Sequence, residues 1–197
     1  MTTPLKDFAA CYDFSDIEIA IQSWFESAGD LVSPPDNADD GREDWQLPEG
    51  DIAVVTAFQN QVFQQVRPRV VVDFNGIAPA TTPPKQICDS NGMLRCWLYR
   101  GTLRLGIVTK PDYAYHQSVR SLVAALADTI APMIRAADNS GAGANQYLTN
   151  HQIAYISANS QDMSITPEDG HFVSQLTYTV QFAVQPSAWP GGINATP

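Results

Sequence analysis

The most regular hydrophobic pattern in the chain lies in residues 95–108, RCWLYRGTLRLGIV. Trp97, Tyr99, Leu103, Leu105 and Ile107 fall on odd positions, whereas Arg100, Thr102 and Arg104 fall on even positions. This two-residue period predicts a strand with one buried face and one wet face. Lys110-Pro111 ends the pattern, because proline cannot extend a strand ladder. The two arginines are therefore expected to point to solvent or to a partner.

A helical pattern follows this strand. Asp112 stands where a helix N-cap is favoured, and Pro132 is expected to terminate or kink the helix near its far end. Between them, apolar residues recur at spacings of three and four, which predicts an amphipathic helix. These residues are Tyr115, Val119, Leu122, Val123, Leu126, Ile130 and Met133. A long strand that leads into such a helix indicates a sheet with a helix laid across it.

The N-terminal half contains one clear helix and one clear strand. A helix is predicted to follow Asp13 or Ser15 and to end at Gly29. Residues 69–74 alternate between apolar and polar, which predicts a strand, and Asn75-Gly76 predicts a turn or bulge after it. The intervening segment, residues 51–66, fits either a helix or short strands. The helical stripe consists of Ile17, Ala20, Ile21, Trp24 and Phe25.

The C-terminal half ends in a predicted hairpin. Residues 151–158 predict a short strand, residues 172–184 alternate almost perfectly, and the turn between them is expected near 166–170. Together the elements predict an α+β fold: a mostly antiparallel sheet of about four or five strands with two or three helices packed on one face. One domain is expected over residues 1–190, with an acidic loop at 30–50, and residues 191–197 are expected to form a flexible tail.

The charge of the 197-residue chain, −10 in total, is distributed unevenly. Residues 1–51 contain 13 acidic and 2 basic side chains, whereas residues 52–197 contain 8 acidic and 9 basic ones. The first part therefore has a net charge of −11 and the second a net charge of +1. An acidic chain is not expected to grip nucleic acid, because phosphate binding needs clustered Lys and Arg. No apolar stretch is long enough for a membrane span.

The histidines, glycines and cysteines of the chain match no motif of a catalytic or metal-binding site. His116, His151 and His171 have no metal-binding spacing and are expected to be surface or capping residues. Gly141 and Gly143 lack the lysine of a phosphate-binding loop. The three cysteines, with no export signal before them, are expected to be free thiols. No catalytic, cofactor-binding or metal site is therefore expected, and the chain is predicted not to be an enzyme.

The acidic loop partly matches a calcium-binding loop. Asp36, Asp40 and Asp44 fall on ligand positions of the twelve-residue pattern, but Ala38 and Leu47 occupy two other ligand positions. We therefore expect a solvated acidic loop that either stays free or docks on a basic neighbour.

The separated charges predict a possible mode of self-association. Basic strands on one surface and acidic side chains on another would allow identical subunits to join head to tail in a ring. A monomer with ordinary solvated charges is the alternative. The candidate interface residues are Arg67, Arg69, Arg100, Arg104, Asp36, Asp39, Asp40, Glu43 and Asp44.

Three stretches carry a family resemblance: VFQQVRPRVVVDFNGIAP, RGTLRLGIVTKPDYAYHQSVRSLVAALADTI and DGHFVSQLTYTVQFAVQPSAWP. In the order of its predicted helices and strands and in the general character of its sequence, over roughly residues 52–190, the chain resembles bacteriophage tail terminator and neck (head-tail joining) proteins. The resemblance does not extend to the acidic loop or to the WPGG tail. It implies a virion protein of the tail or neck that forms a hexameric ring, caps the tail tube and joins it to the head connector. It further implies no catalytic residue and no cofactor, with DNA passing through the ring without specific binding.

Two other readings stay open. The chain could be another virion adaptor, such as a head-tail stopper or a sheath- or baseplate-associated protein, or it could be a small ligand-binding domain or enzyme. Within the ring reading, residues 36–44 either line the DNA channel or dock on a partner's arginines.

Overall fold

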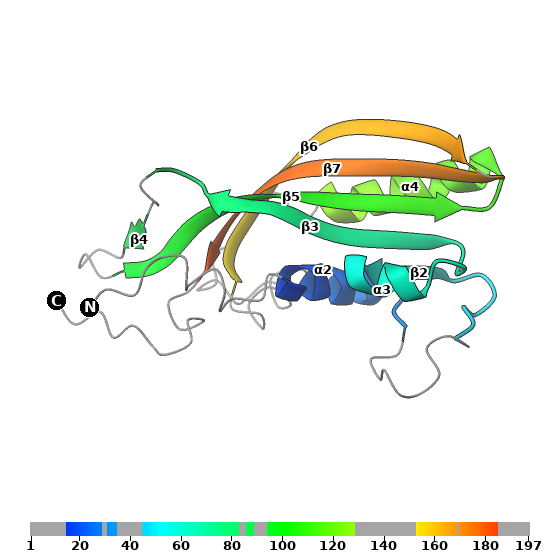
Figure 1. The fold of residues 1–197 in the computed structure, drawn as a ribbon, viewed down its shortest axis with the longest axis horizontal. Coiled ribbons are helices and arrows are strands. Elements are labelled where there is room, and N and C mark those ends of the chain that lie inside the picture. The colour runs from blue at the N-terminus through cyan, green and yellow to red at the C-terminus, as the bar shows by residue number, and fades with distance from the viewer. Residues whose placement is uncertain are drawn as a thin grey trace.

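A computed structural model describes residues 15–28, 31–34, 45–82, 86–88, 94–128, 153–168 and 170–184. The elements in chain order are α2 (Ser15–Ala28), β1 (Leu31–Val32), β2 (Ile52–Thr56), α3 (Ala57–Val62), β3 (Arg69–Pro79), β4 (Gln86–Cys88), β5 (Leu94–Thr109), α4 (Tyr113–Asp128), β6 (Ile153–Glu168) and β7 (His171–Val184) (Figure 1). The ambiguous segment 51–66 is thus a short strand followed directly by a short helix.

All seven strands belong to one mixed sheet. The strand order is β1-β2-β3-β5-β7-β6, and β4 pairs with β5 beside this path. β1, β2 and β3 are parallel to one another, whereas β3, β5, β7 and β6 form antiparallel pairs. The predicted α+β class with a mostly antiparallel sheet is confirmed, with five strands of five residues or more and two shorter ones.

Both long helices pack on the same face of the sheet. Val72, Leu105 and Leu176 are in register on three adjacent strands and are all buried. Side chains from α2 (Ile17, Phe25) join them in a single core cluster with side chains from α4. The helices therefore share one apolar layer, as the alternation of the strands predicted. In Figure 1, α4 runs along β5 and β7, while α2 and α3 lie beside β2 and β3.

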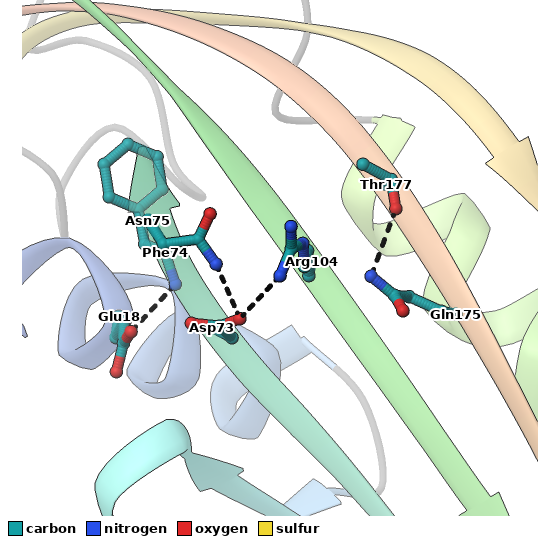
Figure 2. Close-up of polar contacts among 7 residues, drawn as sticks. All are labelled: Glu18, Asp73, Phe74, Asn75, Arg104, Gln175 and Thr177. Atoms are coloured by element: carbon teal, nitrogen blue, oxygen red, sulfur yellow. Dashed lines mark hydrogen bonds and ion pairs between the residues drawn. The ribbon is translucent and has the colours of Figure 1, made fainter. Parts of the chain in front are cut away.

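Side chains of α2 satisfy backbone groups where the short parallel strands end. β2 stops at Thr56, because a capping box between Thr56 and Gln59 starts α3 there. β3 continues past this point, and its Phe74 N–H donates to Glu18 Oε1 at 2.8 Å (Figure 2). Gln22 Nε2 similarly donates to the carbonyl of Val54 at 2.8 Å. Buried backbone groups need such partners, so α2 fixes the edge of the sheet as well as the core.

Helix α4 begins as predicted but turns a different face to the sheet. Asp112 Oδ1 accepts a hydrogen bond from Tyr115 N at 3.2 Å, which confirms the N-cap. The buried residues of the helix are His116, Val119, Arg120, Val123 and Ala127. Leu122 and Leu126 of the predicted stripe are only partly buried, because the helix face that packs on the sheet includes His116 and Arg120 instead. Ile130, Pro132 and Met133 lie outside the described residues.

The hairpin is longer than predicted, and two short strands were not anticipated. β6 continues through Pro167 to Glu168, which pairs with His171. Pro167 is tolerated because β6 is the last strand of the sheet, where a missing N–H breaks no ladder on the outer side. β1 lies inside the predicted acidic loop, and β4 lies in a segment for which no strand was predicted. The turn or bulge predicted at Asn75-Gly76 is a bulge within β3, because the pairing with β5 shifts register there.

Gly101 of β5 leaves room for the ring of Phe74 of β3. A Cβ at Gly101 would lie 2.6 Å from Phe74 Cζ, a distance at which one of the two groups must move. Phe74 is 7% exposed and belongs to the core cluster. The aromatic ring therefore occupies the space that a side chain at position 101 would need.

Candidate interface on the open face of the sheet

The face of the sheet opposite the helices is called here the open face. Its side chains come from alternate positions of β3, β5 and β7, and each of them is half-buried or exposed. The two long helices do not cover this face, since α2 and α4 both contribute to the core cluster on the other side. The open face consists of Val71, Asp73, Asn75, Arg100, Thr102, Arg104, Gly106, Val108, Val173, Gln175, Thr177 and Thr179.

Polar side chains in the centre of the open face contact one another across the strands. Arg104 Nη1 lies 3.9 Å from Asp73 Oδ2 on the neighbouring strand. Asn75 Nδ2 donates to the same carboxylate oxygen at 2.9 Å, and Gln175 Nε2 donates to Thr177 Oγ1 at 3.3 Å (Figure 2). The Arg104 side chain is 48% exposed, and ion pairs at such exposure contribute about 0–1 kcal/mol. A stronger carboxylate partner could therefore compete for this arginine.

Arg100 adds a second positive charge to the same face. It is exposed, it lies on β5 four positions before Arg104, and its register partners are Ala78 and Gln181, which are both uncharged. Among the open-face residues named above, the ionisable side chains are thus those of Arg100, Arg104 and Asp73. The expectation that Arg100 and Arg104 point away from the helices is confirmed.

Arg67 and Arg69 have a different environment. The side chain of Arg69 is 8% exposed and donates to Asn60 Oδ1 at 2.9 Å and to the carbonyls of Gln64 and Val66 at 2.8 and 3.2 Å. Burial, followed by the charge of Arg67, lowers the pKa of Arg69 to about 10. Arg67 Nη1 also donates to the Gln64 carbonyl, at 3.0 Å. Arg69 therefore organises its own chain and is not accessible to a partner, in contrast to the sequence-based expectation.

The acidic half of the candidate interface lies outside the described residues: Asp36, Asp39, Asp40, Glu43 and Asp44. The chain is described again from Trp45, whose ring contacts Phe63 in a T-shaped arrangement with centroids 5.5 Å apart. Phe63 is 3% exposed. This contact places Trp45, which follows the acidic segment in the sequence, beside Phe63 at the end of α3.

His116 corrects the expectation that all three histidines are surface or capping residues. It is fully buried between α4 and the sheet, where Nδ1 lies 2.7 Å from Thr109 Oγ1 and Nε2 lies 3.0 Å from Ser174 Oγ. The sequence itself contains a signal for this cluster. Thr109 and Ser174 are polar residues at positions where the alternation of their strands places core residues. His171 is half-buried at the start of β7, and His151 lies outside the described residues.

The described residues of the open face offer an interaction surface. Within the described ranges, His, Cys, Asp and Glu side chains form no group of three or more that could hold a metal ion. In the same part of the chain, no helix has the length and apolar character needed to span a bilayer. Comparison of the sequence with protein-family models and with curated proteins gives no match.

Proposed function

We propose that the chain is a structural subunit of a phage virion, a tail terminator or neck protein that assembles into a ring. In this role the ring caps the tail tube and joins it to the head connector, and DNA passes through without specific binding. The observation that carries the proposal is the open face, a sheet surface with two exposed arginines that the described helices leave uncovered.

The open face has the properties of a contact between folded subunits. Its side chains stand on strands of 11 to 16 residues in one continuous sheet, so the backbone beneath them is ordered before any partner arrives. Rigid polar surfaces lose little conformational entropy on association. Arg100 and Arg104 present guanidinium groups, which bind carboxylates with two parallel hydrogen bonds. A surface of this kind favours an acidic protein partner.

The same chain contains the complementary charge. Residues 1–51 have a net charge of −11, whereas residues 52–197 have a net charge of +1. In the proposed ring, the acidic segment 36–44 of one subunit docks on the arginines of the next, which is a heterologous contact that closes by rotation. Such a contact assembles faster at low salt and weakens as salt screens the charges.

The test measures the mass of the assembled species by native mass spectrometry and light scattering at low and high salt, with and without tail tube protein. We expect a closed oligomer, with six subunits as the family resemblance implies. The Arg100→Glu/Arg104→Glu double variant is expected to lose assembly. Lys110→Glu is the matched control, because Lys110 is exposed at the end of β5 but does not belong to the open face. A strict monomer at high concentration, with and without tube protein, would refute the ring.

The reciprocal variant neutralises Asp36, Asp39, Asp40, Glu43 and Asp44 together. If the segment docks on arginines, this variant loses assembly and the parent's salt sensitivity disappears. If the segment lines the channel, particles assemble normally but deliver DNA poorly. A variant that assembles, delivers DNA and responds to salt as the parent does would show that the segment is only a solvated loop.

A further inference from the structure

The imidazole of His116 is a titratable group that lies in the protein core. It is 0% exposed, and it touches two strands at once: Thr109 ends β5 and Ser174 lies in β7. The ring centroid also lies 5.7 Å from that of Phe172. His116 is in the first turn of α4, where its N–H donates to the carbonyl of Asp112 at 2.9 Å. One side chain therefore ties the start of α4 to two strands.

The hydrogen bonds fit a neutral imidazole. The Thr109 hydroxyl donates to the carbonyl of Lys110 at 3.3 Å, so its oxygen accepts from Nδ1–H of His116. Nε2 then accepts the hydroxyl proton of Ser174. In this tautomer, each ring nitrogen has a partner of the right kind. Protonation of Nε2 would place a second donor against Ser174, whose hydroxyl would have to reverse.

The surroundings of His116 disfavour a positive charge. Burial, and then the charge of Arg120, lower the pKa of His116 below its ordinary value. His116 also lies at the N-terminal end of α4, where the helix dipole adds positive potential.

Several charged or titratable residues belong to the elements packed around the ring or directly flank them. α4 contributes Arg120, and Asp112 precedes α4 with an exposed side chain that caps the helix. Exposed Lys110 follows the end of β5, and β7 contributes His171, one position before Phe172. The ionisable residues of β6 are Asp162 and Glu168, whose side chains are outside the described set. In register, uncharged residues of β6 stand opposite Ser174 and Phe172.

We infer that His116 is an acid-sensitive latch, which holds the start of α4 on β5 and β7 while it is neutral and releases the helix when it takes up a proton. Opening of α4 exposes the ring to water, where the charged form is readily solvated. The open form therefore binds one more proton than the closed form over the pH interval between the closed-state pKa and about 6.5. The latch does not depend on the proposed virion role.

The test is hydrogen exchange of the α4 amides in the full-length protein from pH 8 to pH 5, expressed as protection relative to the intrinsic exchange rate. Uptake of one proton on opening predicts a loss of protection that approaches about tenfold per pH unit within the sensitive interval. The His116→Gln variant, which does not titrate, is expected to show the same α4 protection throughout. The His151→Gln/His171→Gln variant retains His116 and is expected to respond as the parent does.

Two results would overturn the latch. One is an α4 protection in the parent that stays constant down to pH 5, and the other is an acid response that survives in His116→Gln or disappears in His151→Gln/His171→Gln. If His116→Gln does not fold, the NMR titration of His116 in the parent decides the matter. The latch requires the midpoint of that titration to lie below 6.5 and to coincide with the opening of α4.

Discussion

The contact between Gly101 and Phe74 leads to a sharp prediction about stability. In the Gly101→Ala variant, the added methyl group would lie 2.6 Å from Phe74 Cζ and 3.1 Å from Cε1, with the carbonyl oxygen of Asn75 at 3.3 Å. The ring is buried in the core cluster and the carbonyl belongs to the β3 backbone, so neither can move freely. Overpacking of this kind costs about 1–3 kcal/mol. We expect that loss in the free energy of unfolding.

Gly106 provides a matched control on the same strand. A Cβ at Gly106 would meet Val71 Cβ at 3.6 Å, which is an ordinary van der Waals distance. The Gly106→Ala variant should therefore change the free energy of unfolding by less than about 0.5 kcal/mol. The assay is urea denaturation of all variants at one protein concentration, because association shifts apparent stability. The denaturant slope should stay constant if the native structure alone is strained.

A third variant identifies the atom pair responsible. In Gly101→Ala combined with Phe74→Leu, the ring that clashes is absent, so the two substitutions should be less destabilising together than the sum of their separate effects. A Gly101→Ala protein as stable as the parent would refute the argument. Equal losses at Gly101 and Gly106 would show that any side chain in β5 is harmful, whatever its neighbour.

Two further predictions concern buried side chains. Leu103→Ala should lower the free energy of unfolding by about 2–5 kcal/mol, because Leu103 is 0% exposed in the middle of β5. Leu122→Ala should lower it less, because Leu122 is only partly buried. Urea denaturation compares the two variants, and a larger loss at Leu122 would contradict the helix orientation described above. Burial raises the pKa of Tyr99 to about 12, so the folded state keeps this proton in a pH range where the unfolded chain loses it. The resulting stability is fully present below about pH 10 and is lost as pH rises from about 10 through about 12, at up to about 1.4 kcal/mol per pH unit. Between pH 9 and pH 11, Tyr99→Phe should lose less stability than the parent, and parallel losses would exclude Tyr99 as a source.

The sequence predicted the elements whose own residues determine them. β5 and the start of α4 follow from local alternation and from the Asp112 cap, and both are present in the structure. β1 and β4 have two and three residues, which is too short for a hydrophobic period to be recognised. They exist because longer neighbours supply pairing partners.

The candidate interface was predictable to a lesser extent, for a related reason. The phase of β5 alone places Arg100 and Arg104 on the open face. The burial of Arg69 depends on where the segment after α3 places its carbonyl groups. The hydrophobic pattern of β3 does not indicate that position. The role of His116 likewise requires that Thr109 and Ser174, which are far apart in the sequence, come together.

The position of β7 between β5 and β6 has a consequence for the order of folding. Leu105 of β5 pairs with Leu176 of β7, so during synthesis one edge of β5 has no partner until β7 has left the ribosome. Pairing over such sequence distances raises the contact order, which slows folding. In the meantime, β5 presents an unpaired edge and an apolar face, features that favour aggregation of nascent chains. The open face, to which β7 contributes, is therefore complete only after the hairpin of β6 and β7 has formed.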